Sequence, residues 1–330
     1  MPIITGSEEI LDGIHVVDFN EWGFPCLASG AIVINSRSKI AFLIDTGSSK
    51  SIDYVLKAIK SHDIELGNVI GMVPTHYHFD HAGGSASLLA KIQEYNPDFK
   101  IITRKETKEW LQHPEEHMKG AATTYGDSVG KMPFITDEEF VIIEPDKPFT
   151  LDSLFGKDFN FQYEMNLLST PGHTPDHSSL LLSMENKKYL FSGEAAGTLF
   201  HKDKLISLPT SMPSNYSHSH FMASLDKIIP LNLDAMGFGH FGAIMGKKDI
   251  TEYLNEHKKL IEWFRNEVKH LYEESNSTRH VVNEIFHVWE KRTNTLKMNR
   301  IIMENMCVGL VYGMLIDLGL KEAKYEPRVV

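Results

Sequence analysis

The sequence predicts an α/β fold: a four-layer αβ/βα sandwich over residues 1–247, followed by a helical extension over residues 248–330. Three observations lead to this prediction. Short apolar runs alternate with amphipathic helical patterns in two successive halves of the chain. A dense cluster of histidines directly follows one of the predicted strands. Beyond residue 247 the periodicity is helical only. Two strand-rich halves with helices outside are typical of two sheets packed face to face.

The first half of the chain alternates predicted strands with predicted helices. Strands are expected at residues 14–17, 30–34, 40–44, 69–74 and 99–103, and helices at residues 51–61, 86–92 and 106–112. Residues 113–133 match neither pattern, and we interpret them as a lid over a site. Within that lid His113 and His117 are four residues apart, and we expect them to face solvent together.

The loop Thr75–Gly84 carries ligand-type side chains at unusual density. His76 and His78 are two apart on an extended segment and therefore point the same way, while Asp80 and His81 follow on the turn. This arrangement offers two imidazoles to one metal ion, and a carboxylate and an imidazole to a second. If the loop were only structural, each of these groups would need another partner once buried. We therefore predict a metal site at the end of this strand, where α/β sheets usually hold their chemistry.

The second half returns to a strand pattern. Strands are expected at residues 140–143, 159–163, 167–170, 178–182 and 188–191. A helix is predicted from His218 to about Ile229. His218 and His220 diverge on a helix because they are only two residues apart, so we do not assign them as metal ligands.

The C-terminal extension is predicted to contain three helices. Apolar residues from Ile250 to Leu271 follow one face of a long helix, a second helix begins at Ser277 or Thr278, and a third covers about residues 296–318. Apolar faces this broad must be buried. We expect the helices to roof the metal cleft and also to form a homodimer, with Trp289 and residues 306–315 in an interface.

Composition limits the class of protein. The chain has 330 residues, 42% of them hydrophobic and 23% charged, and a formal net charge of −11, which disfavours nucleic acid as a partner. Cys26 and Cys307 form no CxxC pair and are expected to be buried free thiols, as in a reducing cytosol. The first residues show no secretion signal, and residues 306–315 are too short to span a membrane. We therefore expect a cytoplasmic protein without a membrane partner.

The histidine loop belongs to a series of segments with a known order. His76-x-His78-x-Asp80-His81 resembles the signature of the metallo-β-lactamase-fold hydrolases, in the glyoxalase II, lactonase and thioesterase-like branch. Further segments match that family in order, at residues 41–47, 170–175, 190–194 and 237–242. The resemblance therefore covers roughly residues 10–245.

The resemblance implies a binuclear metal site. The first metal ion is expected at His76, His78 and His173, and the second at Asp80, His81 and His240. Glu194 stands where the family normally has a bridging Asp, so it is expected to contact at least one ion. Asp45 is expected to orient the metal loop. Because all donors are nitrogen or oxygen, we favour two Zn²⁺ ions, with Fe²⁺ or Mn²⁺ as alternatives.

The implied function is hydrolysis of an ester, thioester or lactone of a small molecule by a metal-activated hydroxide, with Asp80 carrying the proton towards the leaving group. Two alternatives remain open. One is a phosphodiesterase or ribonuclease of the same fold, and the other is a diiron redox or oxygen-binding protein. The fold alone does not identify the substrate.

Overall fold

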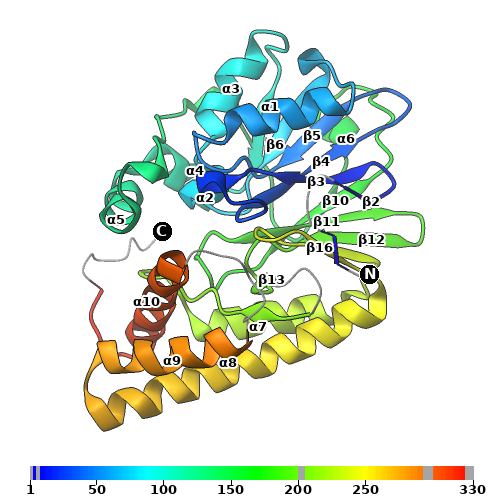
Figure 1. Cartoon of the computed structure of the whole chain (residues 1–330). Helices are drawn as coiled ribbons and strands as arrows, with labels where there is room; N and C mark the ends of the chain where they lie inside the picture. Colours follow the sequence, from blue (N-terminus) through cyan, green and yellow to red (C-terminus); the bar gives the residue numbers. More distant parts are fainter. Residues whose placement is uncertain (1–2, 5–7, 200–204, 293–299, 324–330) are drawn as a thin grey trace.

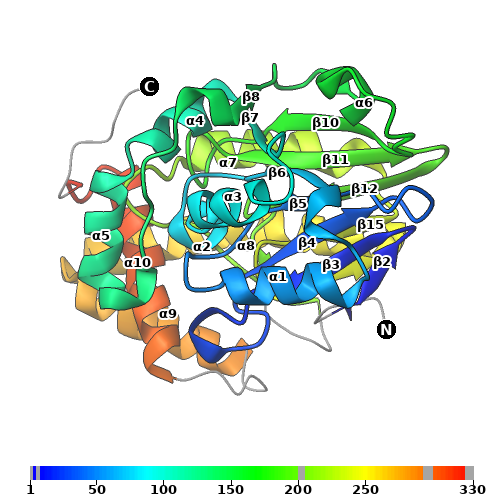
Figure 2. The ribbon, with the colours of Figure 1, turned by 90° about the horizontal axis from the view of Figure 1, so that it is seen from above.

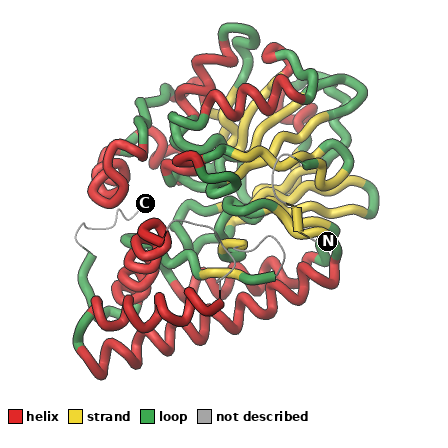
Figure 3. Tube along the Cα trace, viewed as in Figure 1, coloured by secondary structure: helices red, strands yellow, loops and turns green. Residues whose placement is uncertain are grey.

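Two β-sheets lie face to face between two outer layers of helices (Figures 1 and 3). The computed structural model describes residues 3–4, 8–199, 205–292 and 300–323. The layer order in Figure 1 is the helices α1 and α3, the first sheet, the second sheet, and then α7 and α8. This is the predicted four-layer sandwich.

The first sheet has seven strands in the order β2-β3-β4-β5-β6-β7-β8. Its strands are β2 (Glu9–Leu11), β3 (Ile14–Asp18), β4 (Ser29–Ile34), β5 (Ala41–Ile44), β6 (Val69–Val73), β7 (Lys100–Thr103) and β8 (Phe140–Ile142). Strands β2 to β5 pair antiparallel, and β5 to β8 pair parallel. Parallel pairs need helical crossovers, and those crossovers supply the first outer layer.

The first outer layer covers the face of this sheet that points away from the second sheet. Its main helices are α1 (Ile52–Ser61), α3 (Ser85–Gln93) and α4 (Lys105–Gln112). Val55 and Ile59 of α1 and Leu88 of α3 are fully buried in one cluster with Leu43 and Ile101 of the sheet. Each of these helices thus buries the apolar face that its sequence period predicts.

The second sheet also has seven strands, in the order β1-β16-β15-β12-β11-β10-β9. They are β1 (Ile3–Ile4), β9 (Pro148–Phe149), β10 (Glu164–Ser169), β11 (Ser178–Met184), β12 (Lys187–Phe191), β15 (Ala235–Gly237) and β16 (Ala243–Met245). Its inner face packs on the first sheet through one cluster that joins Phe42 and Ile44 to Leu167, Leu180 and Phe191. Two packed sheets of this kind place their strand-end loops along a common edge.

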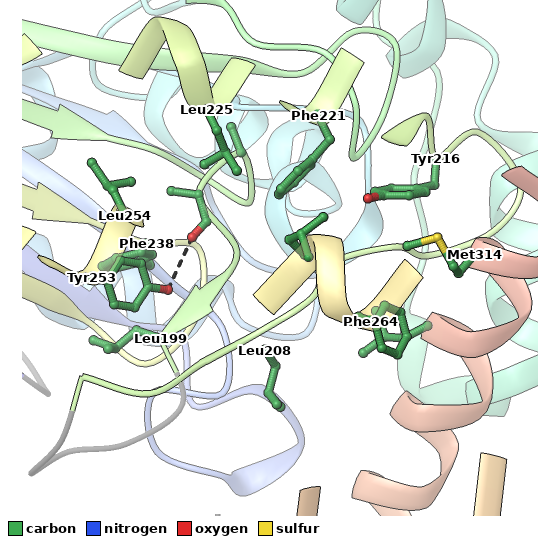
Figure 4. Close-up of a cluster of buried hydrophobic side chains, with 14 of the residues drawn as sticks. Leu199, Leu208, Tyr216, Phe221, Leu225, Phe238, Tyr253, Leu254, Phe264 and Met314 are labelled. Atoms are coloured by element: carbon green, nitrogen blue, oxygen red, sulfur yellow. Dashed lines mark hydrogen bonds between the residues drawn. The ribbon is translucent and has the colours of Figure 1, made fainter. Parts of the chain in front are cut away.

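The second outer layer is built largely from the C-terminal helices. Its elements are α7 (His218–Ile228), α8 (Lys247–Ser275), α9 (Thr278–Arg292) and α10 (Arg300–Asp317). Buried side chains of α7, α8 and α10 join those of the second sheet in one cluster, shown in part in Figure 4. Within it the hydroxyl of Tyr253 donates to the backbone carbonyl of Ala196 at 3.2 Å. The helices therefore share a core with the sheet.

Short elements complete the described chain. They are α2 (Phe79–Ala82), α5 (Glu115–Tyr125), α6 (Leu151–Phe155), β13 (Thr198–Leu199), β14 (Ser207–Leu208), η1 (Glu21–Gly23), η2 (Leu66–Asn68), η3 (Gly126–Val129), η4 (Asp137–Glu139) and η5 (Ile229–Leu231). Seen from above, α5 and α10 lie at the same end of the sandwich (Figure 2). In the described part of the chain, no helix is long and apolar enough to span a bilayer.

Several predictions about elements need correction. Residues 159–163 are not a strand. Pro148–Phe149 pairs with β10 instead, and α6 lies between Pro148–Phe149 and residues 159–163. Residues 115–125 of the predicted lid form the helix α5. The third C-terminal helix is described from Arg300, and its predicted start at residue 296 lies outside the described residues.

The predicted burial of the cysteines and of Trp289 can also be compared with the structure. Cys26 and Cys307 are buried free thiols, as predicted. Trp289 is buried within its own chain, where its ring lies 6.0 Å from that of Phe264, so this residue does not present a surface to a second chain. Residues 306–315 likewise contribute Cys307, Leu310 and neighbours to the core of one chain.

Candidate metal centre

The histidine loop lies between β6 and α3, as the sequence predicts. His76 and His78 lie in the extended segment after β6, and Asp80 and His81 lie in the short helix α2. The loop is held closely: the backbone N–H of Ala82 donates to the carbonyl of His78 at 2.8 Å. His76 and His81 are completely buried, whereas His78 and Asp80 are partly exposed.

Three further side chains reach the same place from the second sheet. His173 follows β10, Glu194 follows β12, and His240 follows β15. Their strands are neighbours or near neighbours in that sheet, and their loops emerge at the edge where the two sheets meet. Tertiary structure thus gathers residues that are far apart in the sequence.

The seven side chains form two groups, each of which offers a set of donor atoms to one cation. His76, His78, His173 and Glu194 make up the first group, and Asp80, His81 and His240 the second, with the donor atoms of each group within 4.8 Å of one another. The three histidines of the first group and the three residues of the second are the sets that the family resemblance implies for the two ions, and Glu194, for which it implies contact with at least one ion, lies in the first group. The seven predicted positions therefore all lie together in the described structure.

The Glu194 carboxylate faces both groups. Its Oε2 atom lies 2.7 Å from Nε2 of His173 and 3.5 Å from Nε2 of both His76 and His81. Its Oε1 atom lies 3.6 Å from Nε2 of His240. Burial opposes ionisation of Glu194, but the surrounding imidazoles, His173 foremost, hold the pKa of this carboxyl well below its usual range. A charged carboxylate between two nitrogen-rich groups is suited to lie between two cations.

Buried histidine nitrogens in both groups fit a metal as their partner. The Nε2 atoms of His76 and His81 are buried and have no hydrogen-bond partner among the described residues. Burial lowers the pKa of His76 and of His78 well below the usual value, which favours the neutral ring that binds a metal, whereas neighbouring carboxylates outweigh burial and raise the pKa of His81 and of His240. Buried polar atoms are rarely left without a partner. The donor set therefore fits divalent metal ions.

Asp45 holds the histidine loop through hydrogen bonds, as predicted. Its Oδ1 atom accepts from the backbone N–H of Thr75 at 2.7 Å, and its Oδ2 atom accepts from the Thr75 hydroxyl at 2.9 Å. The same Oδ2 atom lies 3.1 Å from Nδ1 of His81. Asp45 has φ 58°, in the left-handed region that aspartate tolerates better than most residues. This bend directs its carboxylate towards the loop and turns Nε2 of His81 towards the other donors.

Backbone carbonyls orient the two remaining histidines. Nδ1 of His173 lies 2.6 Å from the carbonyl oxygen of Thr210, and Nδ1 of His240 bonds to that of Leu27. A carbonyl only accepts, so each Nδ1 carries the proton and each Nε2 is free to act as a donor to a cation.

His177 is a supporting residue that the sequence reasoning missed. It is completely buried, and its ring stacks on that of His76 with centroids 5.0 Å apart. Its Nε2 atom accepts from the backbone N–H of Glu194 at 3.0 Å, and its Nδ1 atom lies 3.0 Å from the Thr170 hydroxyl. His177 thus positions the segment that carries Glu194. Its only signal in the sequence was a second histidine four residues after His173.

His117 was predicted to face solvent, and this was wrong. Its Nε2 atom accepts from the backbone N–H of Phe79 at 3.0 Å, and its ring stacks on His78 at 5.0 Å. Burial lowers the pKa of His117 to about 4. His113, by contrast, is exposed. His218 and His220 belong to neither donor group, as predicted. Through His117, the helix α5 contacts the metal loop directly.

A cavity of about 490 Å³ opens beside the two groups. Asp80, Glu194 and His240 line its polar end, α5 lines one side, and α10 with the 209–215 segment lines the other. The predicted contribution of the C-terminal helices to the pocket is confirmed by Met306, Leu310 and Tyr312, among others. This volume is typical of a site for a small molecule.

Tyr77, between the two histidines of the motif, links the centre to these walls. Its ring stacks on that of Trp110 with centroids 4.2 Å apart, and its hydroxyl accepts from Nδ2 of Asn215 at 3.0 Å. The intervening residues of the motif therefore hold the walls of the cavity, while its histidines and aspartate face the centre.

Comparison with known proteins gives a consistent assignment. ST1585 of Sulfurisphaera tokodaii, a metallo-beta-lactamase fold-containing protein, is 28% identical over 74% of this chain and 84% of its own length. A crystal structure of ST1585 superposes with a TM-score of 0.56 at 25% identity and covers 74% of this chain and 86% of that one. An N-acyl homoserine lactonase of a Bacillus species is 27% identical over 40% of each chain. A hydroxyacylglutathione hydrolase of Saccharophagus degradans is 25% identical over 57% of this chain and 52% of its own.

The family model of the metallo-beta-lactamase superfamily matches residues 25–240, well over half of the chain. That span contains all seven residues of the two donor groups. On the strength of the sandwich, the donor groups and this match, the chain belongs to the metallo-beta-lactamase superfamily.

Proposed function

We propose that the protein uses two divalent metal ions to hydrolyse an ester, thioester or lactone bond of a small molecule. The observation that carries the proposal is the pair of donor groups that share the Glu194 carboxylate at the end of an otherwise largely apolar cavity. The superfamily match and the hydrolases among the relatives support the broader statement, that the chain is a metal-dependent hydrolase.

In this proposal, five histidines and two carboxylates hold the two ions. His76, His78 and His173 hold one ion, Asp80, His81 and His240 hold the other, and Glu194 bridges them. The distances from the Glu194 oxygens to histidines of both groups support the bridging role. All donors are nitrogen or oxygen, which suits Zn²⁺ and also Fe²⁺ or Mn²⁺; we propose zinc.

The ions would supply Lewis acidity and lower the pKa of a water molecule in the site. The chain itself has three tasks. Asp80 would accept the proton of that water and pass it towards the leaving group. Asp45 and His177 keep the donor groups in register through the hydrogen bonds described above. The walls of the cavity would hold the substrate so that its carbonyl carbon faces the donor groups. Holding the substrate in this orientation lowers the barrier to the reaction.

The relatives support a carboxylic acid derivative as substrate. One is a lactonase and another a hydrolase of hydroxyacylglutathione, by their names. Among the described residues that line the cavity none is Lys or Arg, the side chains that phosphodiester backbones require. This observation favours the carboxylic derivative over the phosphodiesterase alternative.

Organisation beyond the site is part of the same proposal. Residues 1–247 would carry the chemistry and residues 248–330 would complete the substrate pocket. We also propose a homodimer through the C-terminal helices, on which Val288 is 40% exposed, and a cytoplasmic location, which two buried free thiols favour. Light scattering of the purified protein measures the oligomeric state.

The test combines metal analysis with a substrate panel. The purified protein is expected to carry close to two ions per chain, and to hydrolyse at least one class in a panel of chromogenic esters, thioesters, lactones and phosphodiesters. The double variant His76→Ala/His78→Ala should lose the first ion and nearly all activity. The matched control is His113→Ala/His220→Ala, since both of these histidines are exposed and lie outside the donor groups. Full activity in the first double variant would refute the binuclear assignment.

A further inference from the structure

Helix α10 is apolar on two sides. Val311 and Met314 are fully buried in the core beside the second sheet. Val308 and Ile316 instead line the cavity, and Val308 is 47% exposed there. A helix on the outside of a domain normally carries polar side chains on the face that its own core does not cover. The second apolar side of α10 is therefore a surface that the described part of the chain leaves partly uncovered.

The side of α10 that lines the cavity is long. Asn305, Gly309, Tyr312 and Ile316 all line it, and they are three or four residues apart, so they lie on one side of the helix. From Asn305 to Ile316 this side covers about 16 Å of the helix axis. The cavity is therefore an elongated space that follows α10.

The wall opposite α10 is formed by α5 and is small at its centre. Gly120 and Ala121 line the cavity, and a Cβ atom added to Gly120 would meet no atom of another described segment within 4 Å. Ala122, the next residue, is exposed and does not line the cavity. Larger side chains at Gly120 or Ala121 would occupy the space between the two helices. Their small size therefore keeps this space, which we call the slot, open.

The slot is continuous with the metal centre. Asp80, Glu194 and His240 line the polar end of the same cavity. A chain that lies between α5 and α10 can thus be attached to a carbonyl group that lies at the donor groups. Each methylene group of such a chain gains about fourfold in affinity when both walls bury it, and it brings no polar atom that needs a partner.

We propose that the slot between α5 and α10 binds an unbranched apolar chain of the substrate, and that Ala121 sets the room for this chain. The substrate class is then the ester, thioester or lactone of a molecule with a long alkyl or acyl chain. This inference rests on the proposed function, since it specifies the substrate of the same site.

The first experiment compares two substrates that differ only in chain length. They are p-nitrophenyl octanoate and p-nitrophenyl butanoate, assayed with the zinc-loaded full-length protein. We expect kcat/KM to be at least about tenfold higher for the octanoate, because four more methylene groups enter the slot. Ala121→Leu should remove most of this ratio. The matched control is Ala122→Leu, the same change at the exposed neighbour outside the cavity, and it should keep the ratio.

The second experiment does not depend on catalysis. The fluorescence of Trp22 and Trp110, which line the cavity, measures the binding of decyltrimethylammonium and of butyltrimethylammonium below their micelle concentrations. Both probes have the same head group, so charges in the lining affect them equally. We expect the decyl compound to bind at least about tenfold more tightly in the wild-type protein and in Ala122→Leu, and this difference to be largely lost in Ala121→Leu.

A second variant tests the slot from the neighbouring position. Gly120→Leu places its side chain in open space and replaces the residue that disfavours a helix most after proline, so the fold of α5 is retained. It should reduce the chain-length ratio in both experiments as Ala121→Leu does. An unchanged ratio in both variants would show that the chain does not lie along α5.

The outcomes separate this inference from the proposed function. If the esters are hydrolysed but neither experiment shows a preference for the longer chain, the slot is wrong and hydrolysis stands. If neither ester is hydrolysed but the decyl compound is preferred and Ala121→Leu removes the preference, the slot is right and the proposed reaction is wrong. If Ala122→Leu lowers both ratios as much as Ala121→Leu does, the assignment to Ala121 fails.

Discussion

The two ends of the cavity are built in different ways. At the metal end, every candidate ligand lies in a loop or short helix that directly follows a strand, and hydrogen bonds from buried groups such as Asp45 and His177 hold the loops. At the other end, α5 and α10 come from distant parts of the chain: α10 packs in the apolar core beside the second sheet, and α5 contacts the metal loop through His117. A rigid end suits chemistry that needs fixed geometry, and an apolar end built from appended helices can vary in sequence without disturbing it.

The contact of α10 with the segment before α7 can be broken at one glycine. A Cβ atom at Gly313 would lie 2.0 Å from the backbone carbonyl oxygen of Ser211, so Gly313→Ala forces two backbones apart. We expect a loss of about 3 kcal/mol in the free energy of unfolding, measured by urea denaturation, together with weaker ligand binding. At Gly309 the nearest atom is Sδ of the flexible Met212 side chain, at 2.8 Å. Gly309→Ala is therefore the control, and an equal loss there would contradict this account of the apolar end.

The metal end can be loosened without touching a candidate ligand. In Asp45→Asn one carboxylate oxygen becomes an NH₂ group, so either Thr75 or His81 loses its acceptor. We expect metal affinity to fall about 10–100-fold, since partners of ligating histidines typically have effects of this size. Competition with a chromogenic chelator measures the affinity. Binding of decyltrimethylammonium to the cavity, followed by the fluorescence of Trp22 and Trp110 in its lining, should be unchanged, and a parallel loss of both would show that the two ends are not independent.

A buried titratable group, His257 of α8, lies between that helix and the segment that carries β13 and β14. Its Nδ1 atom lies 2.9 Å from the Ser207 hydroxyl, and its ring lies against Gly197, three residues after Glu194. Burial, and to a smaller extent the positive charge of Arg292, lower the pKa of His257 to about 3. The folded chain thus favours the neutral ring. Its contribution is fully present above about pH 6.5 and is lost as the pH falls towards 3.

Unfolding at two pH values measures this contribution. Between pH 7 and pH 5 the wild-type protein should lose about 2 kcal/mol through His257 alone. His257→Gln, which does not titrate, should show a correspondingly smaller loss over the same interval. Because Gly197 follows Glu194 closely, metal content should be followed in parallel. The same pH dependence in both proteins would show that protonation of His257 does not contribute to the pH dependence of the free energy of unfolding.

Local sequence was sufficient for one part of the molecule. The strand before the histidine loop, the glycines after it, and the spacing of His76, His78, Asp80 and His81 predicted both the loop and its chemistry. This was possible because the strand period and the metal-ligand spacing act over only a few residues. The amphipathic faces of α1 and α8 were predictable for the same reason, since a helix must bury its apolar side somewhere.

Partners that are distant in the sequence were decided only by the tertiary structure. Residues 159–163 have a strand-like composition, yet no neighbouring strand pairs with them, because β10 pairs with Pro148–Phe149 instead. His117 has the spacing of a surface histidine, but the position of α5 places it on His78 and Phe79. His177 acquires its role only when β12 brings Glu194 to it. A hydrogen bond or a cavity wall needs two segments at one place, and the packing of the two sheets and the C-terminal helices determines which segments those are.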